Sequence, residues 1–217
     1  MTSRYGQLLF TEPVQRHQAL GGSRASYAHM TAGPPDADRL TAAEAEFAAT
    51  RTSFYLASTG STGWPYVQHR GGPEGFLRAL DDRTLAFADY RGNKQYITTG
   101  NLDSDNRVSL FLMDYPSRSR LKILGRARAV GPGEWPEGAG DLVPGEYRAT
   151  VERIILIDVE AYDWNCPQHI EPRYTAAELE DALGPLRQRM AQLERENAQL
   201  KAERAQAGRT TAEQAPA

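Results

Sequence analysis

Between residues 53 and 159 the chain is a series of short extended runs separated by turns, and this pattern limits its fold more than any other feature. The runs are apolar or alternate apolar with polar residues, and turn-forming residues separate them. A parallel doubly wound sheet would need a helix after nearly every strand, which this sequence does not supply. The pattern therefore predicts a mainly β protein with a mostly antiparallel barrel. The expected strands lie within 54–57, 64–69, 76–80, 84–89, 108–113, 121–130 and 151–159.

A few short helices are expected around these strands, near 13–20, over 42–50 and within 94–101. Thr41 and Glu44 form the pattern of a capping box, in which the threonine hydroxyl and the glutamate carboxylate each bond the backbone at the start of a helix. The predicted organisation has four parts. These are an N-terminal arm with short helices over 1–50, the barrel over 51–173, a C-terminal helix over 174–205 and a disordered tail over 206–217.

The C-terminal region changes from the period of a strand to the period of a helix. A second capping box, Thr175 and Glu178, precedes residues spaced alternately by four and three. This spacing predicts a parallel two-stranded coiled coil from 176 to about 204, with Asn197 facing its own copy. A single amphipathic helix packed on the barrel is the alternative, and Pro185 predicts a kink or break. The seam consists of Leu179, Leu183, Leu186, Met190, Leu193, Asn197 and Leu200.

Composition argues against several classes of protein. The 217 residues carry a formal net charge of -3, which gives nucleic-acid binding no overall electrostatic support. No apolar run is long enough to span a membrane, and the N-terminus lacks the apolar core of a signal peptide. The single cysteine, Cys166, excludes an internal disulfide and argues against a structural zinc site. We therefore expect a cytoplasmic protein that binds neither nucleic acid nor membranes and holds no metal.

Two polar motifs at strand ends are candidates for an anion site. The first, Gln68-His69-Arg70-Gly71-Gly72, combines a guanidinium that donates in a fork with glycines that let the backbone approach a ligand. The second, Asp89-Tyr90-Arg91-Gly92-Asn93-Lys94, precedes an expected short helix, whose backbone amides and neighbouring cations suit a phosphate. Each motif also fits an ordinary polar turn, so their residues alone leave both interpretations open.

Two other motifs are less specific. Basic residues alternate along the run that contains 121–130, where they fit either an anion site or a solvated sheet face. The segment 163–170 contains Trp164, Cys166 and His169 without the ligand spacing of a metal site, and we expect Cys166 to be a packed thiol rather than a nucleophile. Any chemistry would then come from a cofactor. The basic residues are Arg118, Arg120, Lys122, Arg126 and Arg128.

Six segments, 54–57, 63–73, 80–93, 100–102, 108–112 and 121–127, share their order and spacing with a known family. Together they resemble the FMN-binding split-barrel family of pyridoxamine 5'-phosphate oxidase-like proteins. The match is specific from about 50 to 130 and looser to 173. It is strongest to the branch called flavin-nucleotide-binding proteins, which carry Arg-Gly-Gly and Tyr-Arg-Gly-Asn stretches.

This resemblance implies a six-stranded antiparallel split barrel and a homodimer with FMN at the subunit interface. The strand that ends at Gln68-His69-Arg70 would run along the flavin, the strand that ends at Phe87-Ala88 would border it, and Lys94 would hold the phosphate. Asn93 stands where the better-known oxidases place an arginine. The cofactor-binding residues that the resemblance implies are Gln68, His69, Arg70, Gly71, Phe87, Ala88, Arg91, Asn93, Lys94, Arg120, Gln168 and His169.

Departures from the family pattern bear on the substrate. Arg120 stands where the oxidases usually have a glutamine near the ring, and Trp164 with Gln168-His169 does not match their C-terminal pyridoxal-phosphate-binding signature. Vitamin B6 oxidation is therefore not expected. The resemblance implies an FMN-dependent oxidoreductase acting on an unidentified small molecule. A non-catalytic flavin-binding or flavin-buffering module and a deazaflavin-dependent reductase on the same barrel stay open as alternatives.

Overall fold

The computed structural model describes residues 4–142, 147–164 and 167–213. Its central element is one antiparallel sheet with the strand order β2-β1-β5-β6-β7-β4-β3. Every run that the sequence predicts as a strand lies in or overlaps one of these strands, so the mainly β fold is confirmed. The strands are β1 (Ser53–Thr59), β2 (Pro65–Gly71), β3 (Leu77–Ala79), β4 (Thr84–Tyr90), β5 (Arg107–Asp114), β6 (Ser119–Val130) and β7 (Val151–Trp164).

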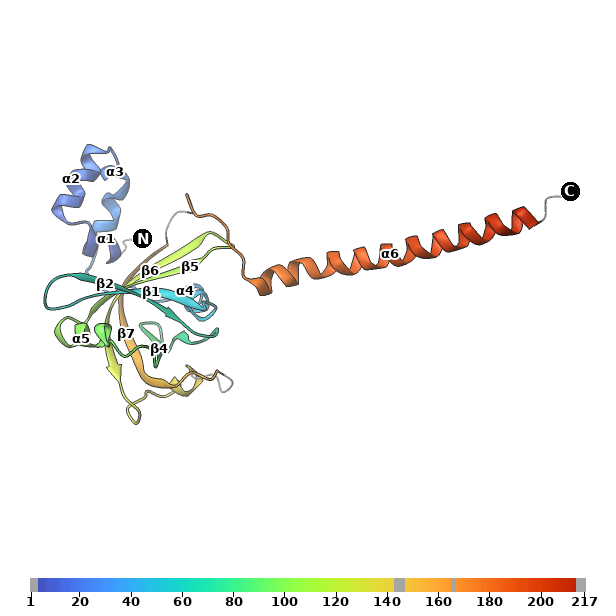
Figure 1. The fold of residues 1–217 in the computed structure, drawn as a ribbon. Coiled ribbons are helices and arrows are strands. Elements are labelled where there is room, and N and C mark those ends of the chain that lie inside the picture. Colours follow the sequence, from blue (N-terminus) through green and yellow to red (C-terminus); the bar gives the residue numbers. More distant parts are fainter. Residues whose placement is uncertain (1–3, 143–146, 165–166, 214–217) are drawn as a thin grey trace. The chain divides into compact units, whose positions relative to one another are not determined.

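The sheet curls into an incomplete barrel with β2 and β3 as its two edge strands (Figure 1). The count of six strands implied by the resemblance is one too few. Residues 77–79 pair with β4 as a separate strand, with Leu77 opposite Phe87. The sequence pattern itself contained this seventh run.

The two longest strands, β6 and β7, bend at Gly125. Their register shifts between Leu124 and Gly125, which marks a bulge. A Cβ atom at Gly125 would lie 2.7 Å from both the Asp158 carbonyl oxygen and the Ile157 side chain. Only glycine therefore allows the two strands to approach this closely, and the bulge contributes to the curl of the sheet.

Two apolar clusters lie on the two faces of β4 and β7. The main core fills the inside of the curled sheet and includes Phe54, Leu110 and Phe87, all almost fully buried. A second cluster on the other face joins Ala88, Ile154 and their neighbours. Because both faces of β4 are covered, this strand is a continuous apolar run rather than an alternating one.

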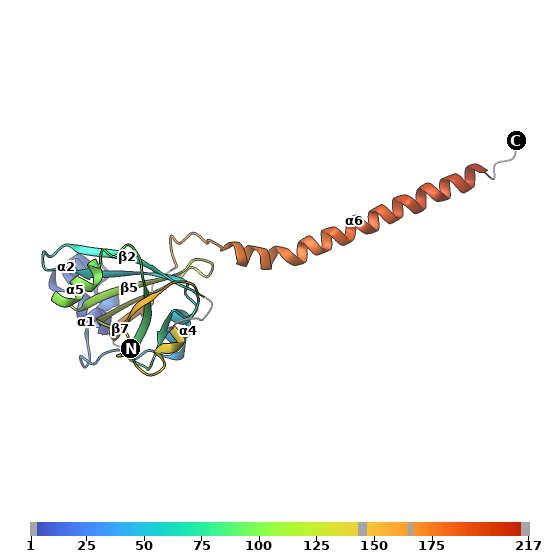
Figure 2. The same ribbon diagram turned by 60° about the horizontal axis from the view of Figure 1, so that its bottom comes forward.

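Short helices surround the sheet. Near the N-terminus the structure has α1 (Arg4–Leu9), α2 (Glu12–Leu20), α3 (Arg24–Tyr27) and the 3-10 helix η1 (Ala28–Thr31), of which only α2 was predicted. The helix α4 (Ala42–Ala49) begins with the predicted capping box. Figures 1 and 2 show α4 and α5 (Ile97–Ser104) on opposite sides of the curled sheet. A further 3-10 helix, η2, spans Ala139–Leu142.

The helix α6 (Ala176–Glu213) belongs to a compact unit of its own, Pro172–Ala217, separate from the unit that ends at Glu171. It is continuous through Pro185, so the break that the sequence suggested is absent from this described helix. It also continues through 206–213, where a disordered tail was expected. The pairing of α6 with a second copy stays a prediction. None of the described helices is both long enough and apolar enough to cross a membrane.

Candidate functional site

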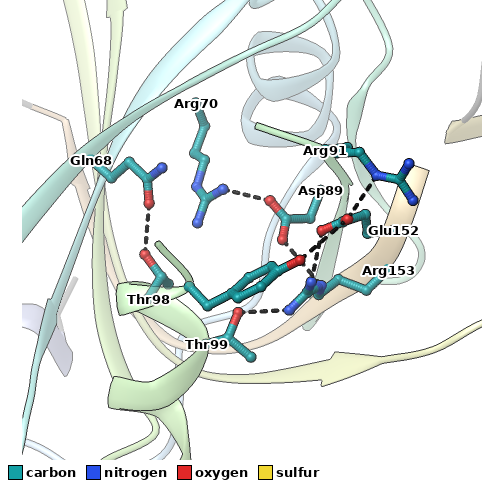
Figure 3. Close-up of polar contacts among 9 residues, drawn as sticks. Gln68, Arg70, Asp89, Arg91, Thr98, Thr99, Glu152 and Arg153 are labelled. Atoms are coloured by element: carbon teal, nitrogen blue, oxygen red, sulfur yellow. Dashed lines mark hydrogen bonds and ion pairs between the residues drawn. The ribbon is translucent and has the colours of Figure 1, made fainter. Parts of the chain in front are cut away.

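The two polar motifs at strand ends lie together around one pocket. Gln68 and Arg70 of β2 line it with Asn93 and Lys94 of the turn after β4. The start of α5 and the start of β7 complete the wall, where Thr98 and Glu152 lie (Figure 3). Residues far apart in the sequence therefore form one polar site, as the interpretation of the two motifs as an anion site requires.

Strand alternation decides which residues of the first motif face this pocket. Gln68 and Arg70 are two residues apart on β2, so they point to the same face. His69 lies between them and points to the other face, where its ring packs against Tyr55 with the two centroids 5.7 Å apart. Gly71 ends the strand. Only Gln68 and Arg70 of this predicted set thus line the pocket within one chain.

The turn between β4 and α5 has an unusual backbone. Lys94 and Tyr96 adopt left-handed conformations with φ of 62° and 52°, which side-chain-bearing residues rarely do. The helix α5 therefore begins at Ile97, later than the predicted 94. Its described first turn has neither a side-chain cap nor an acidic residue, so the amides there suit an anion.

A hydrogen bond joins α5 to the edge strand. The hydroxyl of Thr98, which is buried, donates to Oε1 of Gln68 at 2.9 Å. This bond fixes the orientation of the Gln68 amide and leaves its nitrogen as the free donor end. The start of α5 is thereby held against β2 at the pocket.

Asp89 is the centre of a buried ion network. Its carboxylate accepts a hydrogen bond from Nη1 of Arg70 at 2.5 Å and lies 3.4 Å from Nε of Arg153 on β7. Burial raises the pKa of Asp89 above its ordinary value, although both arginines act in the opposite direction. Burial also lowers the pKa of Arg70, whose guanidinium nevertheless stays charged. Figure 3 shows Arg70 and Asp89 pointing toward one another.

A second carboxylate extends this network toward solvent. Glu152 accepts from Nη2 of Arg153 and from Nε of Arg91, both at 2.9 Å. The hydrogen bond from Arg91 lowers the pKa of Glu152 below its ordinary value. Arg153 also donates to the hydroxyl of Thr99 on α5 at 2.9 Å. The network therefore ties β2, β4, β7 and α5 into one rigid arrangement.

The site carries more positive than negative charge. The cations Arg70, Arg91, Lys94 and Arg153 lie in or around it, against the carboxylates of Asp89 and Glu152. Within the described residues no ion pair involves Lys94, and Nε of Arg70 is buried without a hydrogen-bond partner. The residues that line the pocket are balanced in charge, and the flanking Arg91 and Arg153 give the whole network an excess of two positive charges. This excess matches a phosphate monoester, which carries nearly two negative charges at neutral pH.

Several residues implied by the resemblance do not line the pocket themselves. Phe87 and Ala88 are 0% and 2% exposed within the two apolar clusters, so their side chains do not reach the pocket. Arg91 is exposed and pairs with Glu152. Arg120 of β6, which pairs with Met113 of β5, is outside the pocket lining, as are the exposed Gln168 and His169. The prediction that Cys166 is packed concerns a residue outside the described ones.

Sequence reasoning missed part of the site. Thr98, Thr99, Glu152 and Arg153 were not among the candidates, and Asp89 was quoted only as the start of a motif. Glu152 and Arg153 come from β7, and no local pattern connects them with the β4–α5 turn. Their only signal was a pair of opposite charges at the start of a predicted strand.

Two of the basic residues of β6 form ion pairs with carboxylates. Lys122 pairs with Asp163 at 2.8 Å, and Arg126 pairs with Glu160 at 3.0 Å. Both pairs join β6 to β7, which for Lys122 and Arg126 favours a place on a sheet face over a role in an anion site.

Comparison with known proteins gives both a family match and structural neighbours. None of the curated proteins compared matches the chain. HupZ of Group A Streptococcus shares 18% identity over 62% of this chain and 100% of its own, with a TM-score of 0.46. A putative pyridoxamine 5'-phosphate oxidase of Lactobacillus delbrueckii shares 21% over 58% and 93%, with a TM-score of 0.42. An FMN-binding protein of Syntrophomonas wolfei shares 11% over 68% and 97%, with a TM-score of 0.40.

The family match covers the barrel and the strands that form the pocket. Residues 40–162, more than half of the chain, match the model of the family described as pyridoxamine 5'-phosphate oxidase. This range includes α4, all the strands up to Tyr162 and both polar motifs. The chain therefore belongs to the pyridoxamine 5'-phosphate oxidase family.

Proposed function

We propose that this protein binds FMN in the pocket between β2, the β4–α5 turn and β7, and that it is an oxidoreductase acting on a small molecule. The observation that carries the proposal is the pair of cations in the pocket, where Lys94 has no ion pair among the described residues and the buried Nε of Arg70 has no hydrogen-bond partner. The flanking Arg91 and Arg153 give the surrounding network a positive excess. Membership of the family and the resemblance of the two motifs to its flavin-binding branch support the choice of FMN as the anion.

The described residues fit the phosphate of this cofactor. Lys94 and Arg70 would neutralise its charge, with the buried Nε of Arg70 as an additional donor. Asn93 and the uncapped amides of α5 would supply neutral donors. Asp89 positions Arg70, and Glu152 positions Arg153, so these two arginines are held in place before the ligand arrives.

The flavin ring would lie along β2. The free amide end of Gln68 would donate to its polar edge, and the backbone at Gly71 would allow close approach. Phe87 and Ala88 would contribute backbone contacts and support, since their side chains are buried. FMN supplies hydride or electron transfer, and donors near the ring would stabilise its reduced anionic form.

The proposal includes a homodimer, in which the remaining residues would come from the second copy. Arg120, Gln168 and His169 lie outside the pocket of one chain, so the second copy would bring them to the flavin. Tyr55 and Val67 on the outer face of β1 and β2 are 41% and 61% exposed, and His69 shares this face. An exposed apolar face beside the pocket is typical of a subunit interface and supports this assembly.

Mass spectrometry of the ligand released from protein purified without added cofactor tests the proposal. We expect FMN, together with the yellow colour of a flavoprotein. Release of a deazaflavin, or failure to take up added FMN, would contradict the cofactor assignment.

The oxidoreductase role is tested separately on the loaded protein. A nicotinamide nucleotide should reduce the bound flavin, and a small-molecule acceptor should reoxidise it with turnover. If FMN binds but neither half-reaction exceeds that of free FMN, the protein is a flavin-binding module and not an enzyme.

A further inference from the structure

The helix α6 presents an apolar stripe with no partner in the described residues. Its seam residues Leu179, Leu186 and Leu193 are 46%, 58% and 47% exposed, and Leu200 is 64% exposed. The a-position residues Leu183 and Met190 are 39% and 54% exposed. Most helical stability in proteins comes from the packing of an amphipathic face, so a helix with a regular apolar stripe and polar remaining faces gains much of its stability from a partner.

We propose that the α6 helices of two copies of this chain form a parallel, in-register coiled coil over residues 179–201. The seam alternates steps of four and three over three heptads, which fits a left-handed two-stranded coil. A helix packed on a barrel would use a wider apolar face than this narrow a/d seam. The apolar stripe of one α6 therefore packs against the same stripe of a second copy of the chain.

The flanking charges are complementary in this alignment. Arg189 at a g position faces Glu194 at the e position of the second copy, and Glu196 faces Lys201 in the same way. Each exposed pair contributes only about 0–1 kcal/mol, so the pairs guide the alignment more than they stabilise it.

Asn197 selects the parallel direction. In an antiparallel alignment Arg187 could still face Glu194, so the charges alone permit both directions. That alignment, however, places an a residue against a d residue and sets the Asn197 amide opposite Leu186, where it would be buried without a partner. In the parallel coil the two Asn197 amides meet and bond each other.

Disulfide trapping in the full-length protein tests this direction. In a Cys166→Ser background, Asn197→Cys places one thiol per chain at the seam, and Gln199→Cys places it at an outward c position of the same turn. In a glutathione buffer we expect Asn197→Cys to form a covalent dimer, seen on a non-reducing gel, while Gln199→Cys stays a single chain. Equal crosslinking of both variants, or none in Asn197→Cys, would overturn the coiled coil.

A mixed experiment separates the two directions. Chains with Asn197→Cys are produced together with longer, tagged chains that carry Leu186→Cys. A disulfide between the two kinds of chain would show the antiparallel alignment and overturn the parallel one; we expect each kind to pair only with itself. Bound flavin is measured on the same samples and should be unchanged, so failure of this proposal and failure of FMN binding are distinguishable.

Discussion

The barrel and the helix α6 show two ways in which a sequence specifies structure. In the barrel, Leu110 is fully buried among residues from several strands, and the pocket draws on β2, β4, α5 and β7. In α6, Leu186 is 58% exposed. The barrel depends on residues that are far apart in the sequence, whereas α6 depends on spacings of three and four residues.

The two capping boxes make this comparison direct. Thr41 and Glu44 begin α4, and Thr175 and Glu178 begin α6, with the same hydrogen bonds between threonine and glutamate. In the barrel, Glu44 is only 5% exposed and also accepts from Nε1 of Trp164 at 2.7 Å. The same local motif therefore contributes different amounts to stability in the two regions, because tertiary packing buries Glu44 and leaves Glu178 exposed.

The largest expected effect is the difference in barrel stability between a substitution in the barrel core and one on the exposed stripe of α6. Leu110→Ala removes buried methyl groups from the main core and should lower the free energy of unfolding of the barrel by about 2–5 kcal/mol. Leu186→Ala should leave it within about 0.5 kcal/mol, since that side chain lies outside the barrel unit. Urea unfolding followed by tryptophan fluorescence measures the barrel alone, because all three tryptophans precede α6. Similar losses in both variants would contradict the separation.

A substitution at Pro185 tests the stability of α6. Pro185 lies inside α6, where it removes a backbone hydrogen bond, and Pro185→Ala should stabilise the helix by up to about 3 kcal/mol. Circular dichroism at 222 nm should show a higher melting temperature of α6, with tryptophan fluorescence of the barrel unchanged. A barrel that also becomes more stable would mean that the two units unfold together.

Glu44→Gln should weaken the barrel by about 1.5–3 kcal/mol, the range for hydrogen bonds to a charged group. Burial acts to raise the pKa of Glu44, but hydrogen bonds from Thr41 and Trp164 outweigh it, and the pKa is lowered overall. The ionised group therefore stabilises the barrel above the ordinary pKa, and this contribution is lost as pH falls through the lowered value. The difference between the variant and the wild type should shrink in acid.

The matched control is Glu178→Gln, which breaks the exposed capping box of α6. It should cost that helix about 1 kcal/mol or less. If Glu178→Gln destabilised its helix as much as Glu44→Gln destabilises the barrel, burial would not explain the difference.

The next largest expected effect is a loss of FMN affinity on substitution at the proposed cofactor site. Lys94→Ala should weaken FMN binding by about 1–3 kcal/mol, the scale of a charge-assisted hydrogen bond, and Arg70→Ala should act in the same direction. Fluorescence quenching of FMN measures the affinity. Arg83→Ala, an exposed cation just before the opposite end of β4, is the control and should bind normally. Unchanged affinity in both Lys94→Ala and Arg70→Ala would remove the site assignment.

The smallest effect is expected at the single thiol. Cys166→Ser should leave flavin binding and turnover unchanged, because the sequence shows no activating partner for it beyond the nearby His169. Loss of turnover with FMN still bound would show a catalytic thiol. This result would also decide whether the Cys166→Ser background is suitable for the disulfide experiment.

Local patterns predicted the elements of both regions well. Alternating and continuous apolar runs located all the strands, and the heptad spacing located α6. Both capping boxes were visible in the sequence, since a capping box involves residues only three apart. The boundaries of α5 and the end of α6 were less accurate. The left-handed turn at Lys94 and Tyr96 delays α5, and no local rule predicts that conformation.

The sequence by itself therefore determined the strands, the helix α6 and the two polar motifs that form most of the pocket. Tertiary structure alone decided that Gln68 and Arg70 face the pocket while His69 does not, since strand pairing fixes which face is inward. It also brought Glu152 and Arg153 of β7 to Asp89, and it buried Phe87 and Ala88 in the two apolar clusters. Local hydrogen bonds and apolar periodicity act over a few residues. The charge balance of a binding site depends instead on side chains that only the folded sheet brings within a few ångströms of one another.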